Sequence, residues 1–292
     1  MTTRFAPSPT GLLHLGHAYA AKVAHERGSE FLLRFEDIDH TRVREEYYGQ
    51  IEEDLRWLGI DWSGVPWRQL DRMTHYQEAL EKLKSMGVVY PCFCTRREIS
   101  EIANAPQGPE GPIYPGTCRK LSEADVLKKS KTAEPAWRLD TGKVTSELSF
   151  NDRIHGEIEV DSTLLGDVVL ARRDIGTSYH LAVVVDDAAQ EIDLVTRGED
   201  LLSSTHVHRV LQNLLGFREP EYEHHRLICD ATGERLAKRN EAASIKGMRE
   251  SEKDLMSTLR VTLSKRPTFD RRGSAASAGS LPPRHYKSHP QD

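Results

Sequence analysis

The first 35 residues constrain the fold most, because they alternate between strand and helix patterns around a single turn. Residues 2–6 are short and apolar enough to predict a strand, and the turn after them is rich in proline and glycine. A helical pattern covers Ala18–Arg27, with Gly28 at the position of a C-terminal glycine cap, and Phe31–Phe35 predicts a buried strand. Two strands joined through a helix form a βαβ unit, so this segment predicts a parallel sheet.

The α/β pattern is interrupted and then returns. Amphipathic helices are predicted at Tyr47–Leu58 and Asp71–Met86, whereas residues 91–120 are rich in Cys, Pro and Gly and have little period of either kind. Leu181–Val185 fits a buried strand or a buried helix, because periodicity alone does not separate them. The remaining patterns predict strands at Ala136–Leu139, Ile154–Val160, Asp167–Ala171 and Ile192–Thr196, and an amphipathic helix at Ser203–Leu215.

We therefore interpret the 292 residues as one sheet domain that is split by an insertion. This organisation agrees with a prior of about two domains for a chain of this length. The predicted boundaries are a first half of the sheet domain at 1–88, an insertion at 89–178, a second half at 179–242, a C-terminal helical segment at 243–265 and a flexible tail at 266–292.

Composition excludes several classes of protein. Apolar residues make up 38% and charged residues 29%, which is typical of a globular chain. No aliphatic run approaches the roughly 18 residues that span a bilayer, and the N-terminus lacks the pattern of a secretory signal. We expect a monomeric cytoplasmic protein without a membrane partner. The net charge of −5 argues against non-specific nucleic-acid binding, so an RNA partner would be recognised through local patches and shape.

The turn between the first strand and the first helix carries two histidines. In open α/β sheets, phosphates bind at this turn, on the free N–H groups of the helix N-terminus. The segment Pro7–His17 lacks the Walker A lysine and the Gly-x-Gly-x-x-Gly spacing. His14 and His17 are three residues apart instead, which predicts that both imidazoles lie beside the helix N-terminus and stabilise charge on a phosphate under attack. The alternative is two ordinary histidines in a capped turn, and the Pro, Gly and βα context favours the catalytic interpretation.

The segment Arg4–Gly11 together with His14–His17 resembles the signature of class I glutamyl-tRNA synthetases and their relatives, including the "HIGH" element of that family. The resemblance covers roughly residues 2–250. It implies an α/β fold, in which a Rossmann-like parallel sheet is split by a zinc-bearing α+β insertion that holds the tRNA. Four further segments match the family in the same order, namely Arg34–Asp39, Tyr179–Asp187, Thr196–Asp200 and Arg235–Arg239.

The last of these segments resembles the "KMSKS" element, a loop whose second lysine contacts the ATP phosphates. That lysine corresponds to Lys238, whereas Arg235 stands in place of the first lysine and Ala237 in place of the serine. Since the second lysine is kept, we expect activity. The resemblance implies that ATP is used with Mg²⁺, and that the catalytic and ATP-binding residues are His14, Gly16, His17 and Lys238, with Gly16 in a binding role only.

A glutamate substrate requires a cation for its side-chain carboxylate and an anion near its ammonium group, and arginine suits the first task. The resemblance implies that Arg4 and Arg197 are the cations of the glutamate site, that Glu36 faces the substrate and that Tyr179 contributes a hydroxyl group. It also predicts that the wall of the glutamate site includes Phe5, Ala6, Pro7 and Ser8. We expect the pair Asp186–Asp187 to have a structural role, such as ending a helix or strand, and not to belong to the site.

Three clustered cysteines, Cys92, Cys94 and Cys118, favour metal binding over disulfide bonding in a chain without an export signal. Three thiolates need a fourth ligand to complete a tetrahedral zinc site, and no histidine lies between the first and last of them. The Tyr114 phenol is the nearest candidate by pattern. This arrangement resembles the zinc site of one branch of the family, the glutamyl-Q tRNA(Asp) synthetases, and implies one structural zinc ion. The alternative is a set of reduced cysteines in a Pro-rich loop, and we expect Cys229 to be a buried apolar residue.

The residues after Lys238 are too few for the large anticodon-binding region of full synthetases, so we expect the truncated branch. The resemblance then implies that ATP activates L-glutamate to glutamyl-adenylate and that the glutamyl group moves to the queuosine base at the anticodon wobble position of tRNA(Asp). Three alternatives stay open. They are a truncated glutamyl-tRNA synthetase, another nucleotidyltransferase that acts on a small alcohol phosphate, and a catalytically inactive zinc- and RNA-binding paralogue.

Overall fold

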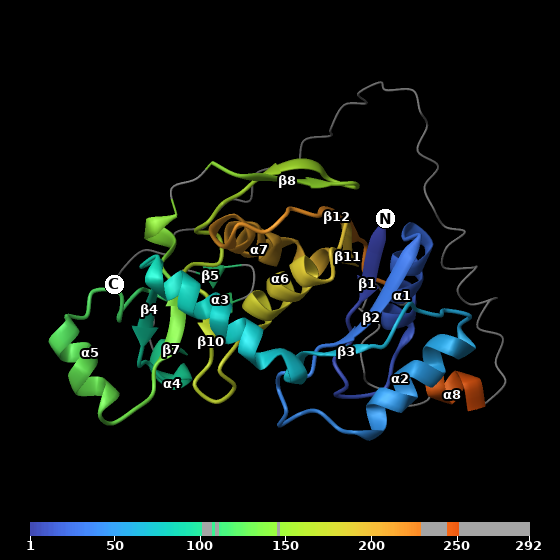
Figure 1. Ribbon diagram of the computed structural model, residues 1–292, viewed down its shortest axis with the longest axis horizontal. Helices are drawn as coiled ribbons and strands as arrows, with labels where there is room; N and C mark the ends of the chain where they lie inside the picture. The colour runs from blue at the N-terminus through green and yellow to red at the C-terminus, as the bar shows by residue number, and fades with distance from the viewer. Residues whose placement is uncertain (101–106, 109–110, 145–146, 229–243, 251–292) are drawn as a thin grey trace, which may run out of the picture. The chain divides into compact units, whose positions relative to one another are not determined.

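The N-terminal βαβ unit is present as the sequence predicts (Figure 1). The computed structural model describes residues 1–100, 107–108, 111–144, 147–228 and 244–250, which fall within one compact unit. Strands β1 (Thr2–Phe5) and β2 (Glu30–Phe35) are parallel and are joined by helix α1 (Leu15–Arg27). The short strand β3 (Trp67–Arg68) extends this ladder in parallel, after helix α2 (Glu46–Trp57).

A second parallel ladder meets the first. Strands β11 (Leu194–Gly198) and β12 (Glu221–His225) are parallel and enclose helix α7 (Leu202–Leu215). The β1 strand lies beside β11, because Asp193 N–H donates to the Thr2 carbonyl and an Arg4 Nη1–H donates to the Thr196 carbonyl. The two ladders are separate sheets, β1-β2-β3 and β11-β12-β8-β9, that meet where β1 contacts β11, and the predicted α/β fold with a parallel sheet is confirmed.

Gly28 ends α1 for a reason that differs from the prediction. Its backbone is extended, with φ −88° and ψ 144°, so it does not adopt the left-handed conformation of a common glycine cap. A Cβ atom at this position would lie 2.4 Å from Thr3 Oγ1 and 2.6 Å from the Glu30 carbonyl oxygen. Glycine is required here because the chain passes this close to β1 on its way into β2.

An antiparallel sheet separates the two ladders along the chain. It has the order β10-β7-β4 and is formed by β4 (Val89–Cys92), β7 (Ala136–Leu139) and β10 (Val169–Ala171). The remaining described elements of this part are α4 (Arg96–Ser100), β5 (Gln107–Gly108), β6 (Gly111–Pro112) and α5 (Glu123–Ser130).

A hairpin inside the predicted insertion joins the second ladder. Strand β8 (Ser149–Asp152) pairs with β9 (Gly156–Glu159), and Asp152 also pairs in parallel with Tyr222 of β12. The strand predicted at Ile154–Val160 starts two residues later, because the Asp152 carboxylate accepts hydrogen bonds from the N–H groups of residues 154 and 155 and closes a turn. The domain boundaries themselves stay a prediction.

The ambiguous segment Leu181–Val185 is helical, within α6 (Tyr179–Ala189). All five of its residues are buried, since α6 packs between α7 and α3 (Met73–Ser85), which follows a short 3₁₀ turn at Gln69–Arg72. A helix that is covered on every side has no polar face, and so its sequence lacks the period that identifies surface helices.

The pair Asp186–Asp187 also lies inside α6 and is buried, so the expectation that it ends a helix or strand is wrong. Asp187 accepts hydrogen bonds from both Arg4 and Arg34. Asp186 accepts hydrogen bonds from Arg72, Gln69 and Tyr76. These carboxylates join α6 to β1, β2 and the start of α3, which is a structural role of another kind.

A short helix from the C-terminal part of the chain lies against the first βα turn. Helix α8 (Ile245–Glu250) follows Ser244, which forms an isolated bridge with His14, and Ile245 N–H donates to the Leu13 carbonyl. The rest of the helical segment predicted at 243–265, and the tail predicted at 266–292, lie outside the described residues. Among the helices that the structure describes, none is long and apolar enough to cross a membrane.

Candidate active site

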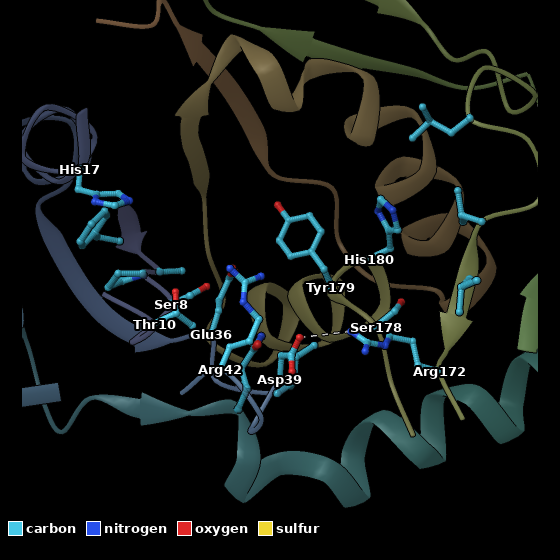
Figure 2. A pocket seen from close by; sticks show the side chains of 18 of the residues that line it. Ser8, Thr10, His17, Glu36, Asp39, Arg42, Arg172, Ser178, Tyr179 and His180 are labelled. Atoms are coloured by element: carbon cyan, nitrogen blue, oxygen red, sulfur yellow. Dashed lines mark hydrogen bonds and ion pairs between the residues drawn. The ribbon is translucent and has the colours of Figure 1, made fainter. Parts of the chain in front are cut away.

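Two adjacent cavities, of about 750 Å³ and 420 Å³, open where strands β1, β2 and β11 end. Ligands in open α/β sheets bind at this carboxyl edge. Figure 2 shows the larger cavity, with Glu36 and Asp39 on one wall and Tyr179 and His180 of α6 on the other. The residues that line both cavities are Phe5, Ala6, His17, Glu36 and Tyr179. The two cavities therefore meet at a wall that contains a carboxyl group, an imidazole and a phenol.

His14 and His17 cap helix α1 reciprocally. The His14 Nδ1 atom accepts a hydrogen bond from Gly16 N–H at 3.1 Å, and the His17 Nδ1 atom accepts one from His14 N–H at 3.3 Å. The two rings stack with centroids 3.8 Å apart. Because both Nδ1 atoms are acceptors, each neutral ring carries its proton on Nε2. The predicted location beside the helix N-terminus is confirmed, and both histidines line the smaller cavity.

Arg4 is buried and already paired. Its guanidinium donates to both carboxylate oxygens of Asp187, at 2.9 and 3.2 Å, and contacts the Thr196 carbonyl at 3.4 Å. Although Arg4 lines the smaller cavity, it forms an ion pair with the buried Asp187 carboxylate, which Arg34 shares. The geometry therefore places at the cavity wall a guanidinium that is already held in an ion pair.

Arg197 has the opposite environment. Its guanidinium donates to His224 Nε2 at 3.0 Å, His208 Nδ1 at 3.1 Å, the Tyr179 hydroxyl at 3.3 Å and the Thr205 hydroxyl at 2.5 Å. Burial, together with the positive charge of Arg197, holds the pKa of His208 well below its ordinary value, so that ring stays neutral. Across the described part of the chain, no carboxylate lies within ion-pair distance of Arg197. A buried cation with neutral partners at a cavity wall is suited to bind a carboxylate.

Glu36 lies where the two cavities meet. Burial raises the pKa of its carboxyl group to about 7, although Arg34 and Arg4 act in the opposite direction. A carboxyl group that titrates near neutral pH in a cavity is a candidate for substrate binding. At the rim of the larger cavity, Asp39 contacts Arg172 at 3.4 Å, and Arg42 and Ser178 add further polar groups (Figure 2).

The structure brings together the predicted glutamate-site residues. Those on the smaller cavity are Arg4, Phe5, Ala6, Glu36, Tyr179 and Arg197, and those on the larger one include Pro7 and Ser8. Gly16 lines the smaller cavity as well. The predicted nucleotide-loop residues Arg235, Ala237 and Lys238 lie outside the described residues, as does Cys229. The roles of all these residues stay predictions.

Sequence reasoning missed the residues that hold the two arginines. Asp187 belongs to a segment that matches the family, but its pairing with Arg4 joins positions far apart in the chain. His208 and His224 are buried histidines on α7 and β12, and no local pattern distinguishes them from core residues. Only the fold brings them to Arg197, so no sequence signal identifies them.

The predicted metal ligands converge at the end of β4. The Sγ atoms of Cys92, Cys94 and Cys118 all lie within 4.8 Å of one another. The Tyr114 hydroxyl oxygen lies 3.4 Å from the Sγ atoms of both Cys92 and Cys94, and it accepts a hydrogen bond from Cys118 N–H at 2.9 Å. Three thiols and one phenol oxygen thus form a cluster that could hold a metal ion. Ile113, the sequence neighbour of Tyr114, lines the larger cavity, whereas none of the four cluster residues does.

Comparison with known proteins agrees with this geometry. Residues 1–270 match the family described as "tRNA synthetases class I (E and Q), catalytic domain". The chain is 49% identical to the glutamyl-Q tRNA(Asp) synthetase of Rhodobacter capsulatus, over 84% of this chain and 93% of that protein. It is 43% identical to the glutamyl-Q tRNA(Asp) synthetase of Nitratidesulfovibrio vulgaris, over 84% of this chain and 80% of that protein.

A solved structure of a glutamate tRNA ligase is also similar to this chain. A glutamate tRNA ligase from Elizabethkingia meningosepticum, determined in complex with its amino acid, superposes with a TM-score of 0.68 and is 30% identical. The match covers 82% of this chain and 52% of the ligase, so the chain spans about half the length of that enzyme. The chain belongs to the class I tRNA synthetases of the glutamate and glutamine type, and within them to the glutamyl-Q tRNA(Asp) synthetase family.

Proposed function

We propose that this protein is a ligase that activates L-glutamate with ATP and transfers the glutamyl group to the queuosine base at the anticodon wobble position of tRNA(Asp). An amino acid, ATP and a tRNA are the substrates of its family. The observation that carries the proposal is the environment of Arg197, a buried cation that has only neutral partners among the described residues. We expect the protein to act as a monomer in the cytoplasm.

The glutamate side chain binds at Arg197. Its carboxylate pairs with the guanidinium, with the Tyr179 hydroxyl beside it, while Glu36 receives the ammonium group at the shared wall of the two cavities. The wall formed by residues 5–8 completes the site. A carboxylate brings a negative charge and two acceptor oxygens to the guanidinium, whereas a neutral amide brings one acceptor oxygen and no charge, so this arrangement favours glutamate over glutamine.

The first reaction step takes place beside the N-terminus of α1. An oxygen of the glutamate α-carboxylate attacks the α-phosphorus of ATP, and the bond to pyrophosphate breaks. The Nε2–H groups of His14 and His17 stabilise the charge that develops on the phosphate, and Gly16 lets the phosphate approach the helix N-terminus. Lys238, which lies outside the described residues, would place its ammonium group beside the leaving pyrophosphate. Mg²⁺ would bind together with ATP.

The second step uses the larger cavity. A hydroxyl group of the queuosine base attacks the carbonyl carbon of glutamyl-adenylate and loses its proton to solvent, and AMP leaves with the bonding electrons. The shared wall supports this assignment, since Glu36 and Tyr179 border both cavities, so that an acceptor in one cavity would be next to the adenylate in the other. The polar rim formed by Asp39, Arg172 and Ser178 offers hydrogen-bonding groups to a base and its hydroxyls.

The metal cluster belongs to the part of the chain that would bind tRNA. Cys92, Cys94, Cys118 and Tyr114 would hold one zinc ion, whose role is structural because its ligand set is complete. Within the predicted boundaries at 89–178, this insertion would cradle the anticodon stem-loop. Its position at the edge of the larger cavity supports that role.

Exchange of labelled pyrophosphate into ATP tests the proposal, with glutamate as substrate, glutamine and aspartate as controls, and no tRNA. Exchange that depends on glutamate alone supports activation without tRNA and the proposed branch. Exchange that begins only after tRNA is added supports a truncated glutamyl-tRNA synthetase. A lack of exchange under both conditions supports an inactive zinc- and RNA-binding paralogue.

A further inference from the structure

A buried carboxylate lies behind Arg197, with one imidazole between them. His224 on β12 is fully buried, and its Nε2 atom accepts the hydrogen bond from Arg197 Nε–H at 3.0 Å. Its other ring nitrogen, Nδ1, lies 2.7 Å from the Oδ2 atom of Asp152 on β8, which is also buried. The three side chains form a line that runs from the second ladder to the wall of the smaller cavity.

The direction of each hydrogen bond in this line follows from the arginine. A guanidinium N–H can only donate, so His224 Nε2 must present its lone pair to Arg197. Burial is the main reason why the pKa of His224 falls to about 3, and the positive charge of Arg197 adds to it, so the ring is neutral at working pH. A neutral ring with an unprotonated Nε2 carries its proton on Nδ1, and that proton is donated to Asp152.

The Asp152 carboxylate is itself firmly held. Its Oδ2 atom also accepts from His224 N–H at 3.0 Å, and its Oδ1 atom accepts from the N–H groups of Ile154 and His155 at 2.9 Å each. Asp152 is also the residue of β8 that pairs with β12, opposite Tyr222. The hairpin thus joins the second ladder at the residue whose side chain fixes His224.

Arg4 and Arg197, which both line the smaller cavity, differ in whether they contact a carboxylate directly. Asp187 pairs directly with Arg4, and also with Arg34. Asp152 acts on Arg197 only through an imidazole, which orients the guanidinium but leaves its charge unpaired. His208 contacts another nitrogen of Arg197, and its second ring nitrogen lies 3.2 Å from Nδ1 of His180, with no carboxylate bound to it among the residues that the structure describes.

We infer that Asp152 and His224 are positioning residues for the glutamate site: they fix the plane of the Arg197 guanidinium, so that it receives the side-chain carboxylate of glutamate. The inference rests on the proposed function, in which Arg197 binds that carboxylate. Neither residue lines either of the two cavities described above, so neither would touch the substrate. Their effect is on substrate affinity. Asp152 keeps the proton of His224 on Nδ1, so that Nε2 accepts the hydrogen bond that orients Arg197.

The first test is Asp152→Asn. An amide can present either its oxygen or its NH₂ group to Nδ1, so the ring is no longer fixed with its lone pair toward Arg197. Because a hydrogen bond to a charged group is lost or weakened, we expect the KM for glutamate in pyrophosphate exchange to rise about 10- to 100-fold. The kcat and the KM for ATP should stay within about twofold of those of the unchanged protein. An interaction that is made equally with the bound substrate and with the transition state affects KM alone when it is lost.

Asp167→Asn is the matched control. Asp167 is as buried as Asp152 and accepts hydrogen bonds from Arg119, Tyr90 and Thr141, but it does not contact Arg197 or its partners. The Asp167→Asn variant should have a lower free energy of unfolding and an unchanged KM for glutamate. At His224, glutamine keeps an acceptor for Arg197 Nε–H and alanine does not, so His224→Gln should retain a lower KM than His224→Ala.

A second readout is independent of activity. Nitrogen-15 NMR of the histidine rings in the unchanged protein should show His224 protonated at Nδ1 and unprotonated at Nε2, and Asp152→Asn should convert part or all of the population to the other tautomer. If the unchanged protein exchanges pyrophosphate with glutamate but Asp152→Asn has the same KM, the positioning role is refuted and the proposed function stands. If the unchanged protein shows no glutamate-dependent exchange, the proposed function fails, and the NMR tautomer still reports on the line of side chains.

Discussion

Arg4 on β1 and Asp187 in α6 form a buried ion pair with two contacts, at 2.9 and 3.2 Å, although 183 positions separate them in the chain. Arg34 on β2 donates to the same carboxylate at 2.8 Å. One side chain of the second half of the chain thereby holds two strands of the first half in place. The cavities lie at this junction, so the candidate site depends on it.

Asp187→Asn should reduce the free energy of unfolding by about 3–5 kcal/mol, the usual cost of removing one partner from a buried pair. Burial acts to raise the pKa of Asp187, but Arg4 and Arg34 hold it below its ordinary value. Its contribution to stability is therefore complete at neutral pH and disappears as the pH falls through that lowered pKa. Urea unfolding at pH 7 measures the loss.

Asp39→Asn is the control for that measurement. Asp39 pairs with Arg172, and both side chains are about 30% exposed, so its replacement should cost at most about 1 kcal/mol. Equal losses in the two variants would show that the Asp187 pairs contribute no more than a surface contact.

Glu36 should make glutamate binding depend on pH. Burial raises the pKa of its carboxyl group to about 7, so in the free protein it gains its negative charge as the pH rises through that value. Only the charged form pairs with the substrate ammonium. The KM for glutamate in pyrophosphate exchange should therefore fall between pH 6 and pH 8.

Glu36→Gln should have a high KM for glutamate that does not change over this range. The KM for ATP serves as the internal control, since Glu36 is not assigned to that substrate. A flat KM for glutamate in the unchanged protein would mean that Glu36 does not bind the ammonium group.

The sequence predicted the elements that depend on local patterns. The βαβ unit and the position of His14 and His17 follow from the order of strand, turn and helix within the first 35 residues. Helix α6 was left ambiguous because neighbours cover it on every side, which removes the polar face that reveals a helix.

Contacts between distant segments explain what the sequence did not predict. The pairing of Asp152 with β12 and of Asp187 with Arg4 depends on tertiary structure alone. The glutamate-site residues could be proposed because they belong to segments that resemble a known family, and their roles stay predictions. Their supporting residues, such as His224, carry no such signal.

Metal analysis should give about one zinc ion per chain if the converging side chains of Cys92, Cys94, Cys118 and Tyr114 bind the proposed zinc ion. Cys92→Ser should lose the metal and, because the metal stabilises the irregular segment around it, lower the melting temperature. Cys229→Ser is the matched control and should keep the zinc ion and the melting temperature of the unchanged protein. Full zinc content in Cys92→Ser would mean that the ligands are wrongly assigned.

Lys238→Ala should reduce glutamyl-adenylate formation about 10²- to 10³-fold, the usual effect of removing one group that stabilises transition-state charge. Single-turnover formation of the adenylate measures this step. Arg235→Ala, three residues earlier in the same segment, should have a smaller effect, since the family resemblance assigns the phosphate contact to the second cation. A similar loss in both variants would contradict the assignment to Lys238.

The most direct test is the transfer of labelled glutamate to tRNA(Asp) that either carries queuosine or has the unmodified base, each with and without its 3′-terminal CCA. We expect glutamate to be incorporated whenever queuosine is present, including into the tRNA that lacks its 3′ end. Incorporation that requires the 3′ end and is indifferent to queuosine would contradict transfer to the anticodon base and identify a tRNA-charging enzyme instead.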